Sequence, residues 1–277
     1  MAIVTIDQLV DALANNAERV VIDKASIANQ TAGRLCSMWR ATGLPGQGAV
    51  PPTAAVPTNA TLGAVTFANQ TAPVQAYLAW LTVLSGNAAQ GVEIYDRVAH
   101  FGGLSLVLTT PQATTGLDLS TLGVSAARLG AANYSDVQWF LEVYADGGAT
   151  ASSATINVTY DDASTGNLNV IAVGGTLRAG NMFALRPLIP TAQQGRHIRG
   201  INNVTLSAST TVAGNFGFTA MRQQAVSDML IANAPTVKDA MQLGLPSIPN
   251  DACIQFVVVP STTSSGLLRG QAKIAYG

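Results

Sequence analysis

Residues 137–160 read VQWFLEVYADGGATASSATINVTY. From 137 to 145, apolar side chains stand at every second position, which is the period of a β-strand with one buried face. From 154 to 160, Ile, Val and Tyr alternate with Asn and Thr. Asp146, Gly147 and Gly148 mark a turn between the two halves. We therefore predict two strands that pair as a hairpin across a loop of several residues.

Similar short runs continue along the chain, bounded by clusters of Gly, Asn, Asp, Ser and Thr. They are residues 76–84, 91–96, 104–109, 168–173, 182–188, 202–208, 215–220, 253–259 and 267–276. The first run fits a helix as well as a strand, and residues 220–243 fit a helical interruption broken at Pro235. Short strands at this spacing predict a mainly β fold, a β-sandwich or jelly-roll-like body over residues 76–277.

The N-terminal part has helical periodicity instead. Thr5 and Gln8 have the spacing of a capping box, which predicts a helix over residues 5–14. An apolar stripe of helical period predicts a second helix over residues 24–42, ended by Gly43 and Pro45. We therefore predict a short α-helical N-terminal segment over residues 1–43.

Residues 44–75 contain no charged side chain and are punctuated by Gly and Pro. So long a stretch without regular structure is typical of a functional segment or a linker. We predict an extended arm or linker here. As an arm it would lie along a neighbouring subunit; as a linker it would be flexible. The sequence does not separate these alternatives.

The charge content bounds the function. Of 277 residues, 48% are hydrophobic but only 10% are charged, with a net charge of -1, against about 25% charged residues in ordinary soluble domains. Sparse charge opposes self-association weakly, so we predict a surface largely covered by partners, the alternative being a monomer with a Thr/Ser-rich surface. No basic run predicts direct nucleic-acid binding. The N-terminal stretch lacks the basic region and continuous apolar core of a signal peptide, so secretion is not predicted. No apolar run of membrane-spanning length occurs in the sequence.

Catalytic motifs are not found in the sequence. The only histidines are His100 and His197, no G-x-S-x-G elbow occurs, and no Cys/His cluster has zinc spacing. Asp146, Asp161 and Asp162 fall at predicted turns, where Asp is common for local reasons. We therefore predict no catalytic, cofactor-binding or metal-binding residues and no cofactor. The two cysteines are predicted to be buried free thiols, with a single disulfide between them as the alternative.

Four stretches together resemble a family of virion structural proteins of tailed bacteriophages, described as capsid-associated or minor structural proteins. They are RLCSMWRATGLPGQGAVP (34–51), EIYDRVAHFGGLS (93–105), ATINVTYDD (154–162) and NNVTLSASTTVAGNFGFTAMR (202–222). The resemblance covers most of the chain as an order of motifs. It implies a β-sandwich or jelly-roll body with an N-terminal segment, which decorates or cements a capsid as a trimer.

From these observations we predict a non-enzymatic virion structural protein, made in the cytoplasm of the bacterial host and carried on the capsid exterior. Its partners would be copies of itself, forming a trimer, and the major capsid protein or another virion protein, without nucleic acid or membrane. Residues 1–75 would reach the shell, so deletion of residues 1–43 would leave a folded body that no longer binds particles. The predicted assembly contacts are Trp39, Arg40, Leu44, Pro45, Val50 and Val56.

Two alternatives stay open. One is a tail, adaptor or other virion component, which would self-assemble into rings or tubes. The other is a carbohydrate-binding module for host recognition, in which Trp80 or Trp139 would stack on a sugar. Because both tryptophans lie in apolar strand-like runs, packing in the core is the favoured role for each.

Overall fold

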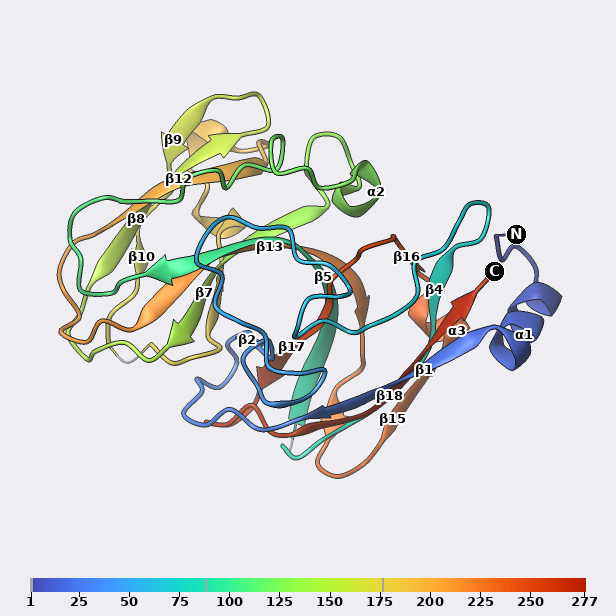
Figure 1. Ribbon diagram of the computed structural model, residues 1–277. Helices are drawn as coiled ribbons and strands as arrows, with labels where there is room; N and C mark the ends of the chain where they lie inside the picture. The colour runs from blue at the N-terminus through green and yellow to red at the C-terminus, as the bar shows by residue number, and fades with distance from the viewer. Residues whose placement is uncertain (1, 88, 176) are drawn as a thin grey trace. The chain divides into compact units, whose positions relative to one another are not determined.

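The computed structural model describes residues 2–87, 89–175 and 177–277 (Figure 1). The chain is 43% strand and 9% helical, with curled antiparallel sheets. The predicted fold class, a β-sandwich or jelly-roll-like body with a short N-terminal helix, is confirmed.

The chain divides into two compact units. Unit 1 comprises Met1–Ala49, Thr58–Asp96 and Gln223–Gly277, and unit 2 comprises Val50–Pro57 and Arg97–Arg222. Boundaries fall inside strands β5 (Ala89–Leu104) and β13 (Asn215–Val226), so each of these strands contributes residues to both units. No boundary lies at residue 43 or 75.

The first sheet of unit 1 is antiparallel throughout. Its strands, in order, are β15 (Thr236–Asp239), β4 (Ala76–Ser85), β18 (Leu268–Tyr276), β1 (Ala17–Lys24) and β3 (Gly43–Leu44), with β16 (Ser247–Ile248) also beside β4. The run at 76–84, ambiguous in the sequence, is thus a strand.

A second set of strands completes unit 1. The strands are β17 (Ile254–Pro260), which pairs with residues 90–96 of β5, β2 (Cys36–Ser37) and β14 (Leu230–Ile231). The apolar core of the unit joins side chains from both sets, among them Ile22, Leu81, Ile94 and Phe256. Burial of one face of each sheet is the main stabilising contribution to such a sandwich.

Helix α1 (Ile6–Asn15) confirms the first predicted helix. Thr5 caps it, the Gln8 N–H donates to the Thr5 hydroxyl at 3.2 Å, and the Gln8 side chain accepts from the Thr5 N–H at 3.1 Å. Small residues of α1, of α3 (Ala240–Leu243) and of the first sheet pack together. Among the described residues, no helix has the length and hydropathy needed to cross a membrane.

Unit 2 has its own core, shared by two sets of strands. One sheet contains β10 (Ile171–Ala172), β8 (Ser153–Tyr160), β12 (Ile198–Leu206) and β6 (Gln112–Ala113), with β9 (Thr165–Asn167) also beside β8. The other set is β11 (Met182–Ala184), β7 (Val137–Ala145), residues 215–222 of β13 and residues 97–104 of β5. Short helical turns are α2 (Ala126–Leu129), η1 (Arg186–Leu188) and η2 (Thr191–Gln193).

The predicted hairpin over residues 137–160 is wrong, although both of its strands form. β7 pairs with β13 and β11, whereas β8 pairs with β12, β9 and β10. The segment between β7 and β8 therefore leads from one sheet to another. Alternation identifies a strand with one buried face, but it carries no information about which strand is its neighbour.

The second predicted helix, over residues 24–42, is also wrong. Its first residue ends β1, and the rest is irregular chain interrupted by β2. Asn29 (φ 60°) and Gly33 (φ 75°) have left-handed backbone conformations that an α-helix does not contain. Its apolar residues Cys36, Met38 and Trp39 are buried by tertiary packing instead. Cys36 and Cys253 are both buried and are not joined in a disulfide, as predicted.

Two further expectations, a helical interruption at residues 220–243 and a separate arm at residues 44–75, are also wrong, because tertiary packing decides the structure of both segments. Residues 220–243 contain the end of β13, then β14 and β15, and are helical only in α3. The segment 44–75 is no separate arm, because Val65 and Phe67 lie in the core of unit 1 and Val65 forms a bridge with Ile254. β1 pairs with β18 along eight residues. Deletion of residues 1–43 would therefore uncover β18 rather than leave a complete body.

Candidate functional site

The six predicted contact residues are divided between the units. Trp39, Arg40, Leu44 and Pro45 belong to unit 1, and Val50 and Val56 belong to unit 2. Both valines are half-buried. Between them, Ala55 exchanges two main-chain hydrogen bonds with His100, so this short segment is fixed to β5 within unit 2.

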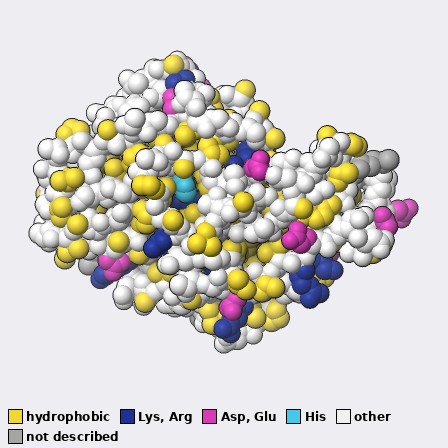
Figure 2. Space-filling model, in the orientation of Figure 1, with side chains coloured by type: hydrophobic (Ala, Val, Ile, Leu, Met, Phe, Trp, Pro, Cys, Tyr) yellow, Lys and Arg dark blue, Asp and Glu magenta, His cyan; other side chains and the backbone are white. Residues whose placement is uncertain are grey.

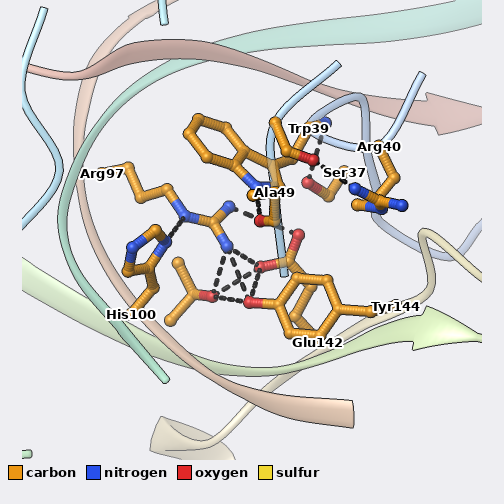
Figure 3. Close-up of polar contacts among 10 residues, drawn as sticks. Ser37, Trp39, Arg40, Ala49, Arg97, His100, Glu142 and Tyr144 are labelled. Carbon is orange, nitrogen blue, oxygen red and sulfur yellow. Dashed lines mark hydrogen bonds and ion pairs between the residues drawn. The ribbon is translucent and has the colours of Figure 1, made fainter. Parts of the chain in front are cut away.

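Trp39 is a core residue of unit 1 and offers no contact surface. Its ring is 1% exposed, and its Nε1–H donates to the Ala49 carbonyl at 2.8 Å (Figure 3). Gly48 lies against the ring so closely that a Cβ there would stand 2.1 Å from Cε2. The neighbouring Arg40 guanidinium donates to the Gly48 carbonyl (Figure 3). Both side chains thus hold the 39–49 segment in place.

Leu44 and Pro45, in contrast, line an open groove beside β1. This β1 groove has a volume of about 400 Å³ and is formed by residues 18–21, 44–46, 60–64 and 66. Three of its apolar side chains are more than half exposed, Val21 at 52%, Leu44 at 54% and Leu62 at 66%. Only Glu18 and Arg19 bring charge to it. The groove is therefore an apolar surface at the edge of a sheet.

The edge of β1 in this groove has unpaired main-chain groups. Even-numbered residues bond to β18, because Asn16 accepts from Tyr276 at 2.9 Å and antiparallel bonding alternates. Odd-numbered residues face the other edge, where β3 pairs only with Asp23 and Lys24. In the described part of the chain no strand pairs with β1 from Ala17 to Ile22 on this side. Arg19 and Val21 thus present N–H and C=O groups to the groove.

Lys24 holds one wall of the groove. Its side chain is buried, and Nζ donates to the carbonyls of Ala41 (2.9 Å), Pro45 (2.8 Å) and Gly46 (3.2 Å). Burial lowers the pKa of the Lys24 ammonium to about 8. At Gly43, with φ 116°, a Cβ would lie 1.8 Å from the Asp23 carbonyl oxygen, so only glycine lets β3 close on β1.

Unit 2 contains a buried ion pair that the sequence did not reveal. The Arg97 guanidinium on β5 donates to the Glu142 carboxylate on β7, to the Tyr144 hydroxyl at 2.8 Å and to the Thr219 hydroxyl at 2.9 Å (Figure 3). Arg97 and Glu142 are fully buried. The only sequence signal was a charged residue at an otherwise apolar strand position, which is not specific. Enclosed charges of this kind have no access to a substrate.

His100 completes this network. Its Nδ1 accepts from Arg97 Nε at 3.0 Å, which requires the neutral imidazole. Burial, and secondarily the Arg97 charge, lower the pKa of His100 to about 2. His197, the other histidine, approaches Arg186 at 2.9 Å on the exposed surface.

The three carboxylates at turns accept hydrogen bonds from main-chain N–H groups, and only the partner of Asp162 is close to it in the sequence. Asp146 accepts from Ala179 N–H at 2.8 Å, Asp161 from His197 N–H at 3.0 Å and Asp162 from Ser164 N–H at 3.0 Å. Hydrogen bonds from Ser164 lower the pKa of the Asp162 carboxyl. Within residues 2–87, 89–175 and 177–277, no group of three or more His, Cys, Asp or Glu side chains is arranged to hold a metal ion.

Trp80 and Trp139, the two tryptophans considered for sugar binding, differ in burial. Trp139 is 2% exposed, and its Nε1–H donates to the Ile198 carbonyl at 2.8 Å, so its predicted core role is confirmed. Trp80 is only half-buried and lies on the sheet face opposite the core, where its Nε1–H donates to Thr82 Oγ1 at 2.9 Å. Its predicted core role is therefore wrong, because alternation did not show which face of β4 is inside.

Comparisons with known proteins assign the chain to no family. No protein-family model matches the chain, and no curated protein matches it. A crystal structure of the infectious bursal disease virus VP2 subviral particle is similar at 13% identity, covering 94% of this chain and 80% of that chain, with a TM-score of 0.20. A structure of the Gt strain of that virus gives 10% identity, the same coverage and a TM-score of 0.17. Scores this low establish neither a shared fold nor a shared function.

Proposed function

We propose that this chain is a non-enzymatic structural protein of a tailed-bacteriophage virion, which decorates or cements the capsid as a symmetric oligomer, most simply a trimer. The observation that carries the proposal is the β1 groove, with three more than half-exposed apolar side chains beside unpaired main-chain groups. Soluble proteins normally protect such an edge, because it pairs with other chains.

The surface chemistry supports the same proposal. Charged side chains are few and scattered among neutral ones (Figure 2), in keeping with a charge content of 10% and a net charge of -1. Little electrostatic repulsion therefore opposes repeated contacts between copies. In an assembly, many modest contacts repeated by symmetry would hold the shell through avidity.

The test is the mass of the purified full-length chain in solution by light scattering, followed by negative-stain imaging of the same sample and by co-sedimentation with capsids that lack it. We expect discrete trimeric particles that sediment with capsids. A monomer that does not sediment with capsids would overturn the proposal. Rings or tubes without capsid binding would overturn it in favour of a tail or adaptor component.

A second candidate function rests on Trp80. This half-buried indole lies on the solvent side of the unit 1 sheet, with Asp239 and Lys273 directly opposite it on the two neighbouring strands. An aromatic ring flanked by polar side chains is the chemistry that stacks on a sugar and bonds its hydroxyls. A glycan array with the wild-type chain and a Trp80→Ala variant tests this; binding lost in the variant would support host recognition.

A further inference from the structure

The two edges of the first unit 1 sheet complement each other. β15 is the strand at one end, and β1 is open along residues 17–22 near the other end. Two rows of directly opposite residues cross the sheet from β15 through β4 and β18 to β1. The first row is Asp239, Trp80, Lys273 and Arg19. The second row is Val237, Thr82, Gln271 and Val21. Directly opposite residues point to the same face. Each row thus ends in side chains that a second copy would meet.

The main-chain groups at the two edges also match. Gly86 N–H bonds to Leu267 at 3.1 Å, so even-numbered residues of β4 face β18 and odd-numbered ones face β15. Thr236 and Lys238 therefore bond to β4, and Val237 directs its N–H and C=O away from the sheet. Val21 does the same on β1. Two outward-facing residues of this kind form a hydrogen-bonded pair when their strands run antiparallel.

We propose that β15 of one copy pairs antiparallel with the open edge of β1 in a second copy, with Val237 opposite Val21 and Asp239 opposite Arg19. The occupant of the β1 groove is thus a second copy of this chain. This inference deepens the proposed function and rests on it, because it names the contact that builds the oligomer.

Charge, direction and length all fit this register. The Arg19 guanidinium would face the Asp239 carboxylate, and both side chains are exposed in the single chain. Because neighbouring strands from β15 to β1 alternate in direction, an added β15 is antiparallel to β1 when both copies face the same way. Thr236, the first residue of β15, would lie opposite Ile22, immediately before β3 begins to cover β1 at Asp23.

The apolar side chains follow the same pattern. Val21 and Val237, exposed at 52% and 44%, would cover each other, and the exposed Leu44 and Leu62 flank the incoming strand. The contact joins two different surfaces, so it is heterologous. A heterologous contact closes into a ring when its rotation divides a full turn. A closed trimer is therefore compatible with this contact.

Charge reversal tests the pairing in the full chain. Arg19→Glu and Asp239→Arg should each raise the concentration at which half the chain is assembled by about tenfold or more, because like charges then face each other. The double variant R19E/D239R should restore the wild-type value. Asp7→Arg, an exposed reversal on α1, is the control and should change little. Circular dichroism and thermal unfolding confirm that each variant is folded.

A cysteine pair tests the register independently of charge. Val21→Cys with Val237→Cys should give a ladder of covalent oligomers under mild oxidation, and neither single variant should. Within one chain the two positions are separated by β4 and β18, or about 14 Å at the usual strand spacing, beyond the roughly 7 Å limit of a disulfide. The native cysteines, Cys36 and Cys253, are buried and form no disulfide.

The outcomes separate this inference from the proposed function. If the wild-type chain assembles and binds capsids while all charge variants keep its mass and no ladder forms, the β1–β15 contact is overturned and the proposed function stands. A wild-type chain that is monomeric and does not bind capsids overturns both. Loss of assembly in both single variants with recovery in the double variant supports the contact.

Discussion

Unit 2 encloses its charged network completely, whereas unit 1 leaves a strand edge and several apolar side chains open to solvent. In unit 2, Arg97, Glu142 and their hydroxyl partners satisfy one another inside the protein. In unit 1, Val21, Leu44 and Leu62 surround main-chain groups without a strand partner. This difference predicts that substitutions in the buried network of unit 2 change folding stability. Substitutions in the β1 groove of unit 1 should instead change association between copies.

The largest effect is expected from Arg97→Met. Removing the guanidinium leaves the Glu142 carboxylate buried without its partner, which costs about 3–5 kcal/mol of unfolding free energy. Adding Glu142→Gln removes the uncompensated charge and should recover part of the loss. Urea denaturation of wild type, single and double variants measures this. Equal losses in the single and the double variant would show that the charge itself is not what matters.

Lys24 gives the next largest effect, as a dependence on pH. Because its folded-state pKa of about 8 is below the unfolded value of 10.5, the unfolded chain binds more protons between these values, and stability rises with pH. We expect a gain of about 2 kcal/mol between pH 7 and 9.5. Lys24→Met should lack this gain. Above about pH 10, tyrosine ionisation opposes this gain. Partial burial raises the pKa of the half-buried Tyr276 to about 12, whereas unfolded tyrosine ionises near 10.

His100 acts in the acid range with the same sign as Lys24, so stability again rises with pH. Its folded-state pKa of about 2 is below the ordinary histidine value of 6.5, so the unfolded chain gains a proton as pH falls and the folded chain does not. Stability should fall by about 1.5 kcal/mol between pH 6.5 and 5 from this residue. His100→Asn keeps an acceptor for Arg97 but does not titrate there. The difference between the two stability profiles isolates the effect, and parallel profiles would contradict it.

The smallest effect on stability is expected in the β1 groove. Leu44→Ser together with Leu62→Ser should change the unfolding free energy by no more than about 0.5 kcal/mol per site, as is usual for exposed positions. Light scattering should nevertheless show weaker assembly. Leu108→Ser, at an exposed leucine of unit 2, serves as the control. A large loss of stability without a change in mass would assign the groove to folding.

Sequence reasoning found part of the candidate site. Leu44 and Pro45 were predicted contacts and do line the groove. Trp39 was predicted with them, but Gly48 and Gly63 close over its ring and bury it. Val21, Leu62 and the open edge of β1 were missed. An edge strand and a central strand can have the same alternation, and only the positions of β3 and β18 make β1 an edge.

The sequence by its own periodicity determined the mainly β class, the capped helix α1 and the buried thiols, because these depend on local pattern and hydropathy. Tertiary packing decided which strands pair with each other. It also decided the secondary structure of residues 24–42 and the position of residues 44–75. The apolar stripe around Met38 suits a helix equally well, but left-handed Asn29 and Gly33 and burial in the unit 1 core select irregular chain. Burial of apolar area is non-directional, so the same apolar residues can be buried in a helix or in irregular chain. The sequence pattern does not distinguish these two local structures, and the packing around the segment selects one of them.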